Sequence, residues 1–438
     1  MQSWLGVFKD KEKAKKIVNI DQLRDIVSKD NFSCIGSSHS YNGIQLYKGK
    51  PIDFRNSLLN QITYDEATHQ VTVEPSVTVR QLKEFLNTKN RQLYNSGNYM
   101  DQTVIGAMLT GTHGYGDNAV MAESVESLVI LDEDGIELTF INLKADNEFK
   151  YIALSFGVIQ PIIRMEIATK PISQYSISSC LCSLSEIKFG GNIAFAVFPY
   201  SGDDPIAAIT ECKELSEYQE PTPRPKDWGF LESVKGALIK YYWFVDKYIP
   251  VMRKVVQQGI ALMRGKIQRD IITDPHDIDY LYDPHPLVEH DVSPILSRKI
   301  MKPTETSYNV AFFCPQEITK EVIAYIIDQG NKIKPNGFRN FIGVRNINNK
   351  SDLPFAGNYE GKVSAIDLYS NPGDASFLWE IQRLVFEQFN GIRPHWGKSH
   401  LQPYIFDQFK DYYKRLLEIK ESYCSDKTLL HPDLMDWR

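Results

Sequence analysis

Cysteine is scarce in this sequence, with six residues in 438. Such a sparse set does not suit the disulfide framework of a small secreted domain. The closest pair, Cys180 and Cys182, lacks the spacing of a metal site or of a redox motif. We therefore expect reduced thiols, a reducing compartment and no metal ion.

Long apolar runs are also missing. No uncharged apolar stretch reaches about 18 residues, and no apolar segment precedes the basic cluster within residues 1–16. These absences predict a soluble, cytoplasmic protein. The stretch 236–266 is open to a second interpretation, since lysines and arginines flank its apolar residues. We favour a lid that faces the core and keep contact with a membrane surface as the alternative.

Basic charge is not in excess, because 49 lysine and arginine residues face 55 acidic ones and the net charge is -6. This balance gives no reason to expect a nucleic acid partner. A hydrophobic content of 42% with 24% charged residues is typical of a globular protein, and the length exceeds that of a single core. More than one domain and a small-molecule ligand are therefore expected.

Short apolar strands alternate with tight turns from about residue 32 to residue 164. Thr78 is placed to cap a helix, and an Asp-Gly turn at Gly135 is typical of a hairpin. This pattern predicts an α+β domain rather than a doubly wound one. The expected elements are strands at Phe32–Ile35, Val71–Glu74, Leu128–Leu131 and Ile136–Phe140, and a helix at Val79–Leu86.

Longer units follow Pro171 and predict a second domain, in which two β-α-β units surround an antiparallel sheet. Gly330 is placed to end one of its helices. We expect the domains to cover 1–170, 171–390 with an insertion at about 220–300, and a segment 391–438 that returns to the first domain. The expected strands are Ile193–Phe198, Tyr308–Phe313, Phe341–Ile347 and Val363–Tyr369, and the helices are Gln316–Gln329, one opened by Asp204-Pro205 and one from Asp374.

The first segment that indicates chemistry is the loop Gly36-Ser37-Ser38-His39-Ser40, which directly follows the strand Phe32–Ile35. A glycine and small hydroxyl residues expose backbone N–H groups, which a diphosphate can accept from. His39 carries the only nucleophilic nitrogen among these side chains and could bond covalently to a bound cofactor. The alternative is a surface turn with a hydrogen-bonded histidine.

The second segment, Thr103–Gly116, has four glycines in its last eleven residues and almost no charge. Backbone must approach something closely here, either a ligand or the core. The glycine spacing does not match a dinucleotide-binding fingerprint, and a Rossmann site is excluded.

The third segment, Gly391–His400, is basic and aromatic. Five residues separate Gly391 from Gly397, one too many for a phosphate-binding P-loop. Lys398 could keep its charge there by facing an anion, a flavin or a polar ligand. The alternative is an ordinary surface loop with Trp396 beneath it.

Together, the three segments resemble the sugar-1,4-lactone and alditol oxidases, flavin enzymes of the vanillyl-alcohol-oxidase superfamily. The shared motifs are Gly-x-x-His-Ser, Gly-Ala-x-x-x-Gly-Thr-His-Gly and Arg-Pro-His-Trp-Gly-Lys, and they occur here in that order. Ser3-Trp4 matches the start of the family's pattern, and Ser155–Ile159 resembles the strand that closes its flavin domain.

The resemblance implies a two-lobed FAD-binding domain of the PCMH type and an α+β cap domain built on an antiparallel sheet. It also implies that His39 carries the FAD through a single covalent bond, because no cysteine lies between Asn95 and Thr103. The residues expected to bind the cofactor are Gly36, Ser37, Ser38, His39, Ser40, Thr103, Gly106, Ala107, Gly111, Thr112, His113, Gly114, Gly116, Val158 and His400.

The implied reaction transfers hydride from a carbinol carbon of a sugar lactone or polyol to flavin N5, and oxygen is then reduced to hydrogen peroxide. Lys398 and Arg345 would stabilise negative charge, and His395 or Glu305 would assist proton transfer.

The sequence departs from the family's pattern at two places where residues are expected to contact the hydroxyl groups of the sugar. Relatives often carry Glu-x-Arg on a cap strand, whereas this chain has Gly343-Val344-Arg345. A Glu-x-Glu-Tyr run is reduced to Glu305-Thr-Ser-Tyr308. Two alternatives therefore stay open: an FAD-binding protein with lost or unusual catalysis, and a dehydrogenase acting on a lipid-linked sugar.

Overall fold

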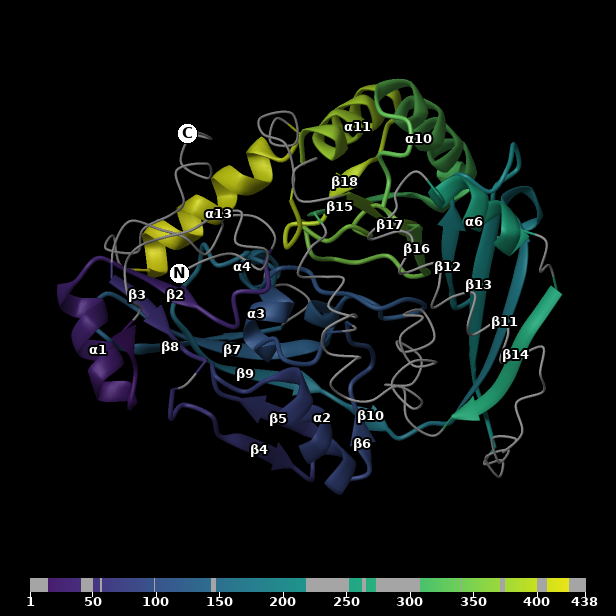
Figure 1. Ribbon diagram of the computed structural model, residues 1–438. Helices are drawn as coiled ribbons and strands as arrows, with labels where there is room; N and C mark the ends of the chain where they lie inside the picture. The colour runs from purple at the N-terminus through teal and green to yellow at the C-terminus, as the bar shows by residue number, and fades with distance from the viewer. Residues whose placement is uncertain are drawn as a thin grey trace.

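The computed structural model describes residues 15–40, 50–55, 57–97, 99–142, 147–217, 252–261, 265–272, 308–339, 341–370, 375–399 and 408–424. Within these residues the chain forms two large antiparallel sheets and two smaller ones (Figure 1). No helix in this part of the chain is long and apolar enough to cross a membrane.

A small parallel sheet opens the fold, with strand order β1-β3-β2. Helix α1 (Ile20–Lys29) packs Leu23, Ile26 and Val27 into the same core as this sheet, and Asn19 caps its first turn. The strands are β1 (Lys15–Lys16), β2 (Phe32–Ile35) and β3 (Lys50–Asp53).

A five-stranded antiparallel sheet, of order β4-β5-β9-β7-β8, forms the second part of this domain. Its buried strand faces and the helices around it share one hydrophobic core. The strands are β4 (Ile62–Asp65), β5 (Gln70–Val73), β7 (Val125–Leu131), β8 (Glu137–Ile141) and β9 (Ile162–Ala168). The helices are α2 (Val79–Thr88), α3 (Val104–Leu109), η1 (Met121–Ser124) and α4 (Asn147–Ile152).

An eight-stranded antiparallel sheet forms the second domain, in the order β14-β11-β13-β12-β16-β17-β15-β18. Helices α10 and α11 lie side by side against it (Figure 1). The strands are β11 (Tyr175–Ser183), β12 (Ile193–Phe198), β13 (Ile206–Glu214), β14 (Gly265–Ile272), β15 (Tyr308–Pro315), β16 (Ile342–Ile347), β17 (Val363–Ser370) and β18 (Arg393–Pro394). The helices are η2 (Leu184–Glu186), α6 (Arg253–Ala261), η5 (Gln316–Ile318), α10 (Thr319–Ile333) and α11 (Ala375–Gln388).

A two-stranded ribbon and the chain's last described helix complete the fold. The ribbon pairs β6 (Arg91–Gln92) with β10 (Lys170–Pro171). Helix α13 (Lys410–Tyr423) places Tyr413, Leu416 and Ile419 in the core of the five-stranded sheet. The last described segment therefore packs on the first domain, while the domain limits stay a prediction.

Three local predictions are wrong. Residues after Asp204-Pro205 form strand β13 instead of a helix, because they pair along their length with β12 and β11. Helix α10 continues past Gly330 to Ile333. Residues 155–159 lie in turns before β9, with positive φ at Phe156 and Gly157.

The predicted insertion 220–300 is described only in part. Strand β14 is an edge strand of the large sheet, and Arg253 of α6 donates hydrogen bonds to the carbonyls of Asn336 and Phe338. These two elements therefore belong to the second domain's own structure. The remainder of the proposed lid lies outside the described residues.

Candidate active site

The loop Gly36–Ser40 leaves strand β2 and lies against Thr103. A Cβ added at Gly36 would lie 2.3 Å from Thr103 Oγ1, so the two segments touch and only glycine fits without a shift. Ser38 has φ 59°, which bends the loop sharply. The first two predicted segments are thus adjacent, although more than sixty residues separate them in the sequence.

His39 is the residue of this loop whose side chain could bond covalently to a cofactor. Its ring lies 4.1 Å, centroid to centroid, from the ring of Tyr99. Burial lowers the pKa of His39 to about 4, although a hydrogen bond with the Asp101 backbone partly opposes the shift. The imidazole is therefore neutral near pH 7 and keeps an unprotonated nitrogen, the form required of a nucleophile.

The segment Thr103–Gly116 forms a wall in which glycines pack without spare room. Added Cβ atoms would lie 2.7 Å from Thr103 Oγ1 at Gly106 and 1.9 Å from Asn95 Oδ1 at Gly114. Ala107 is buried within α3 at the start of this wall. Gly111 and Gly116 have φ values of 72° and 90°, which favour glycine.

The end of this wall is attached to the second domain. Gly116 N donates to Asn346 O at 2.7 Å, and Asn348 N donates to Gly116 O at 3.1 Å. The end of the predicted cofactor wall is therefore hydrogen-bonded to the end of strand β16, which carries Arg345.

Two histidines meet where the wall faces the third segment. The rings of His113 and His395 lie 5.2 Å apart, and each also contacts the ring of Phe313. His395 Nδ1 accepts a hydrogen bond from Gly397 N at 3.1 Å, which places the proton of the neutral ring on Nε2. Burial lowers the pKa of His113 to about 4 and that of His395 well below its usual value.

Lys398 and Arg345 reach the same place from different elements. Arg345 Nη1 lies 3.5 Å from the carbonyl oxygen of His113. Lys398 Nζ lies 3.9 Å from Oδ1 of Asp367, a β17 residue that is 4% exposed. Burial lowers the pKa of Lys398, and Arg345 adds to this effect, whereas Asp367 opposes it. A Cβ added at Gly397 would lie 3.4 Å from Cβ and the carbonyl oxygen of Thr110, so the third segment lies beside the wall.

Asp367 is the residue of this cluster that sequence reasoning missed. An acid inside the otherwise uncharged strand Val363–Ser370 was the available signal, because buried carboxylates need a partner.

The other predicted site residues have different outcomes. Val158 is fully buried in the core of the first domain. Glu305 and His400 fall outside the described residues. The roles of all predicted site residues stay predictions.

Buried polar atoms support a bound cofactor in the first domain. Among the residues that the structure describes, Ser155 Oγ and Gln160 Nε2 have no hydrogen-bond partner, while Gln160 Oε1 accepts from Cys34 N at the end of β2. Buried polar atoms normally have partners. Together with the glycine wall and the neutral His39, these atoms fit a polar ligand that runs from β2 to the third segment.

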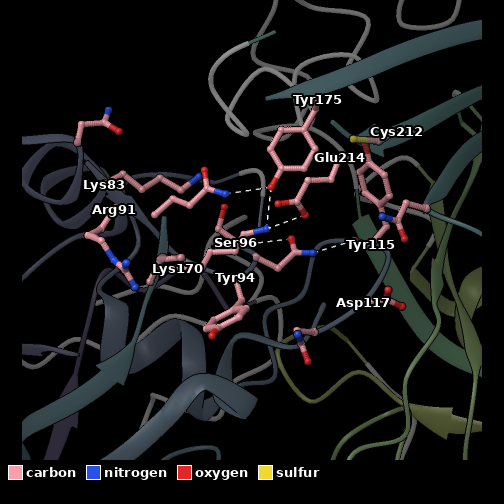
Figure 2. A pocket seen from close by; sticks show the side chains of 16 residues that line it. Lys83, Arg91, Tyr94, Ser96, Tyr115, Asp117, Lys170, Tyr175, Cys212 and Glu214 are labelled. Atoms are coloured by element: carbon pink, nitrogen blue, oxygen red, sulfur yellow. Dashed lines mark hydrogen bonds and ion pairs between the residues drawn. The ribbon is translucent and has the colours of Figure 1, made fainter. Parts of the chain in front are cut away.

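A cavity of about 330 Å³ lies beside the wall, between the ribbon β6–β10 and strands β11 and β13 (Figure 2). Asn95 Nδ2 donates to Tyr115 O at 2.7 Å on its wall side. On the opposite side Lys170 Nζ donates to Tyr175 Oη at 2.8 Å and pairs with Glu214 at 3.1 Å. None of the predicted site residues lines this cavity, which makes it a separate recess between the two domains.

Comparisons with known proteins agree with this geometry. Residues 18–140 match the family model described as an FAD binding domain. The chain is 26% identical over 400 residues to the L-gulono-1,4-lactone dehydrogenase of Mycobacterium tuberculosis. The aligned region covers 87% of this chain and 85% of that protein. The chain is 27% identical over 181 residues to the D-arabinono-1,4-lactone oxidase of Saccharomyces cerevisiae, which covers 39% of this chain and 34% of that one.

A cholesterol oxidase from Brevibacterium sterolicum superimposes with a TM-score of 0.69 at 10% identity, over 100% of this chain and 96% of that one. This likeness shows the fold alone. The superposition confirms the predicted two-domain α+β fold. The family model and the two relatives confirm the predicted resemblance, the FAD-binding domain, the FAD cofactor and the class of FAD-dependent oxidoreductase acting on CH–OH groups.

Proposed function

We propose that this chain, which resembles the sugar-1,4-lactone oxidase family of FAD-dependent oxidoreductases, oxidises a carbinol carbon of a sugar lactone or polyol. The observation that carries the proposal is the convergence of three distant segments: Gly36 packs closely on Thr103, Gly397 lies beside Thr110, and Arg345 Nη1 lies 3.5 Å from the His113 carbonyl oxygen. Their junction combines a cofactor wall with two cations.

The residues that would hold FAD are the Gly36–Ser40 loop, the wall Thr103–Gly116 and the buried segment that contains Val158. When bound, FAD supplies a hydride acceptor for the carbinol carbon. We propose that His39 carries the cofactor through a covalent bond, because its neutral imidazole is an unprotonated nucleophile that packs on Tyr99, shortly before the wall begins at Thr103.

Lys398 and Arg345 would stabilise the oxygen of the substrate as its proton leaves. Both cations are half-buried at the junction of the wall and the eight-stranded sheet, where partial exclusion of water strengthens their field. His395 would be a neutral hydrogen-bond donor through Nε2, because its Nδ1 accepts from Gly397.

We propose oxygen as the electron acceptor, with hydrogen peroxide as the product, and a cytoplasmic location on the ground of six free cysteines. The names of the two relatives include both a dehydrogenase and an oxidase, so peroxide formation is measured beside the reduction of an artificial dye. Dye reduction without peroxide would rule out oxygen and leave the hydride transfer intact.

The test of the whole proposal uses purified protein with its flavin. Anaerobic mixing with a panel of aldonolactones and alditols should bleach the visible flavin spectrum with at least one of them. Acid precipitation should leave the yellow colour with the polypeptide in the parent and in His69→Asn, a control at an exposed histidine, and should release it in His39→Ala.

Two results would contradict parts of the proposal separately. Flavin that remains acid-precipitable in His39→Ala excludes the covalent bond to this residue. A flavin that no lactone or polyol bleaches excludes the reaction and favours an FAD-binding protein without this catalysis, the alternative suggested by the missing acid at Gly343.

A further inference from the structure

Position 343, where relatives often carry a glutamate and this chain has glycine, lies beside an acidic residue on the adjacent strand. Strands β16 and β17 are antiparallel, and their register pairs Gly343 directly with Asp367. Side chains of directly paired residues lie on the same face of a sheet, with Cβ atoms about 5 Å apart. The carboxylate of Asp367 therefore stands beside the place that a glutamate at 343 would occupy.

The same register places this carboxylate on the face of Arg345. Arg345 pairs with Ala365, two residues before Asp367, and side chains two residues apart in a strand share a face. The Glu-x-Arg arrangement of relatives puts an acid and an arginine on one face of one strand. Here the two charges share that face but come from two adjacent strands.

The contacts of Asp367 fix the direction of its carboxylate. Oδ1 lies 3.9 Å from Lys398 Nζ, and Asn309 Nδ2, on the adjacent strand β15, lies 3.4 Å from the same oxygen. Asn309 is itself held by a hydrogen bond from Nδ2 to the carbonyl of Leu368 at 3.1 Å. A buried, oriented carboxylate therefore faces the lysine of the third segment.

Resting on the proposed function, we propose that Asp367 supplies from β17 the carboxylate that position 343 lacks on β16, and that it is a positioning residue that keeps Lys398 charged and held toward the substrate. Among the described residues, the titratable and charged groups that act on Lys398 are Asp367 from β17, Arg345 from β16, His113 from the wall and His395 from its own segment. Both histidines are neutral near pH 7 and carry no charge that acts on Lys398. Burial and Arg345 lower the pKa of Lys398, and the carboxylate of Asp367 raises it.

The experiment measures the charge of Lys398 directly in the flavin-loaded protein. Trace acetylation with acetic anhydride at a series of pH values, quantified by peptide mass spectrometry, gives the midpoint at which Lys398 becomes reactive. Asp367→Asn should lower that midpoint by about one pH unit or more, which makes Lys398 about tenfold more reactive on the acidic side. Asp367→Glu should stay near the parent value.

Two controls separate this effect from general disturbance. Lys332, which pairs with exposed Asp328 at 2.6 Å, should keep its midpoint in both Asp367 variants. Asp328→Asn should leave the midpoint of Lys398 unchanged. If Asp367→Asn does not fold, Asp367→Ser removes the same charge with a smaller side chain.

A rescue variant tests whether positions 343 and 367 are equivalent. Gly343→Glu in the Asp367→Asn background should return the Lys398 midpoint toward the parent value. An unchanged midpoint in Asp367→Asn, or no recovery with Gly343→Glu, overturns the proposal.

Steady-state kinetics then connect the charge to turnover. The alkaline limb of the kcat/KM profile should move to lower pH in Asp367→Asn by the same amount as the labelling midpoint. The labelling needs no substrate, so it separates the two failures. If the protein oxidises no lactone but the labelling midpoint of Lys398 still depends on Asp367, the result contradicts the proposed function alone.

Discussion

Replacing Gly36 by alanine tests whether the histidine loop and the cofactor wall pack as one unit. The new Cβ would lie 2.3 Å from Thr103 Oγ1, while the other two atoms of that side chain stay at 3.5 Å and 3.6 Å. Thr103 is 2% exposed, so its hydroxyl cannot turn into solvent. The conflict is therefore confined to one oxygen atom.

The expected cost follows from this geometry. Overpacking of a buried site destabilises by about 1–3 kcal/mol. Alanine also restricts the unfolded chain, which offsets about 0.4–1 kcal/mol, and the φ of Gly36 lies outside the left-handed region. The net loss is about 1–2 kcal/mol. Thr103→Ala removes the conflicting oxygen, so the double variant should recover most of this loss, a coupling of about 1–2 kcal/mol.

Thermal melting and flavin retention of the four proteins check the reasoning. Gly36→Ala should melt below the parent and retain less FAD, and Gly36→Ala/Thr103→Ala should melt above Gly36→Ala although it carries one more substitution. A double variant that melts below both single variants would mean that Gly36 and Thr103 act independently, and the adjacency of loop and wall would be refuted.

Two further predictions use glycines and a histidine. Gly330→Ala should lower the melting temperature, because its Cβ would lie 2.2 Å from the Phe338 ring. Gly259 is also in a helix but has no atom within 4 Å of an added Cβ, so Gly259→Ala should increase the free energy of unfolding by about 0.5–1 kcal/mol. Equal shifts in the two variants would contradict the close packing of Gly330 on Phe338. His113 has a native pKa of about 4 against about 6.5 when unfolded, so the unfolded chain binds its proton first and stability falls as pH drops through this window. Denaturant melts should show His113→Gln losing about 3 kcal/mol less than the parent between pH 7 and pH 4.

Elements with strong local signals could be predicted from the sequence. Helix α2 begins after Thr78, whose hydroxyl accepts from Gln81 N while the Gln81 side chain accepts from Thr78 N. This capping box is complete within four residues. Strand β12 likewise begins and ends at the predicted residues, because its continuous apolar run is typical of a buried strand.

Elements decided by distant partners could not be predicted in this way. Asp204 reads as a helix cap, but its carboxylate accepts hydrogen bonds from the backbone and hydroxyl of Ser185, and the residues that follow pair with β12. Gly330 reads as a helix end, but the Phe338 ring occupies the space where a side chain would be. In both cases the deciding contact lies outside the local pattern.

The candidate site divides along the same line. Its three segments carry recognisable motifs, because each needs a particular backbone or side chain at a fixed spacing. The acid opposite Lys398 carries no such motif, since the position of Asp367 is meaningful only through the register of β16 with β17. A glycine in the place of an expected glutamate therefore does not establish that the site lacks a carboxylate. The charge of a site on a sheet belongs to a face shared by several strands, so a departure on one strand has to be weighed with the residues paired across it.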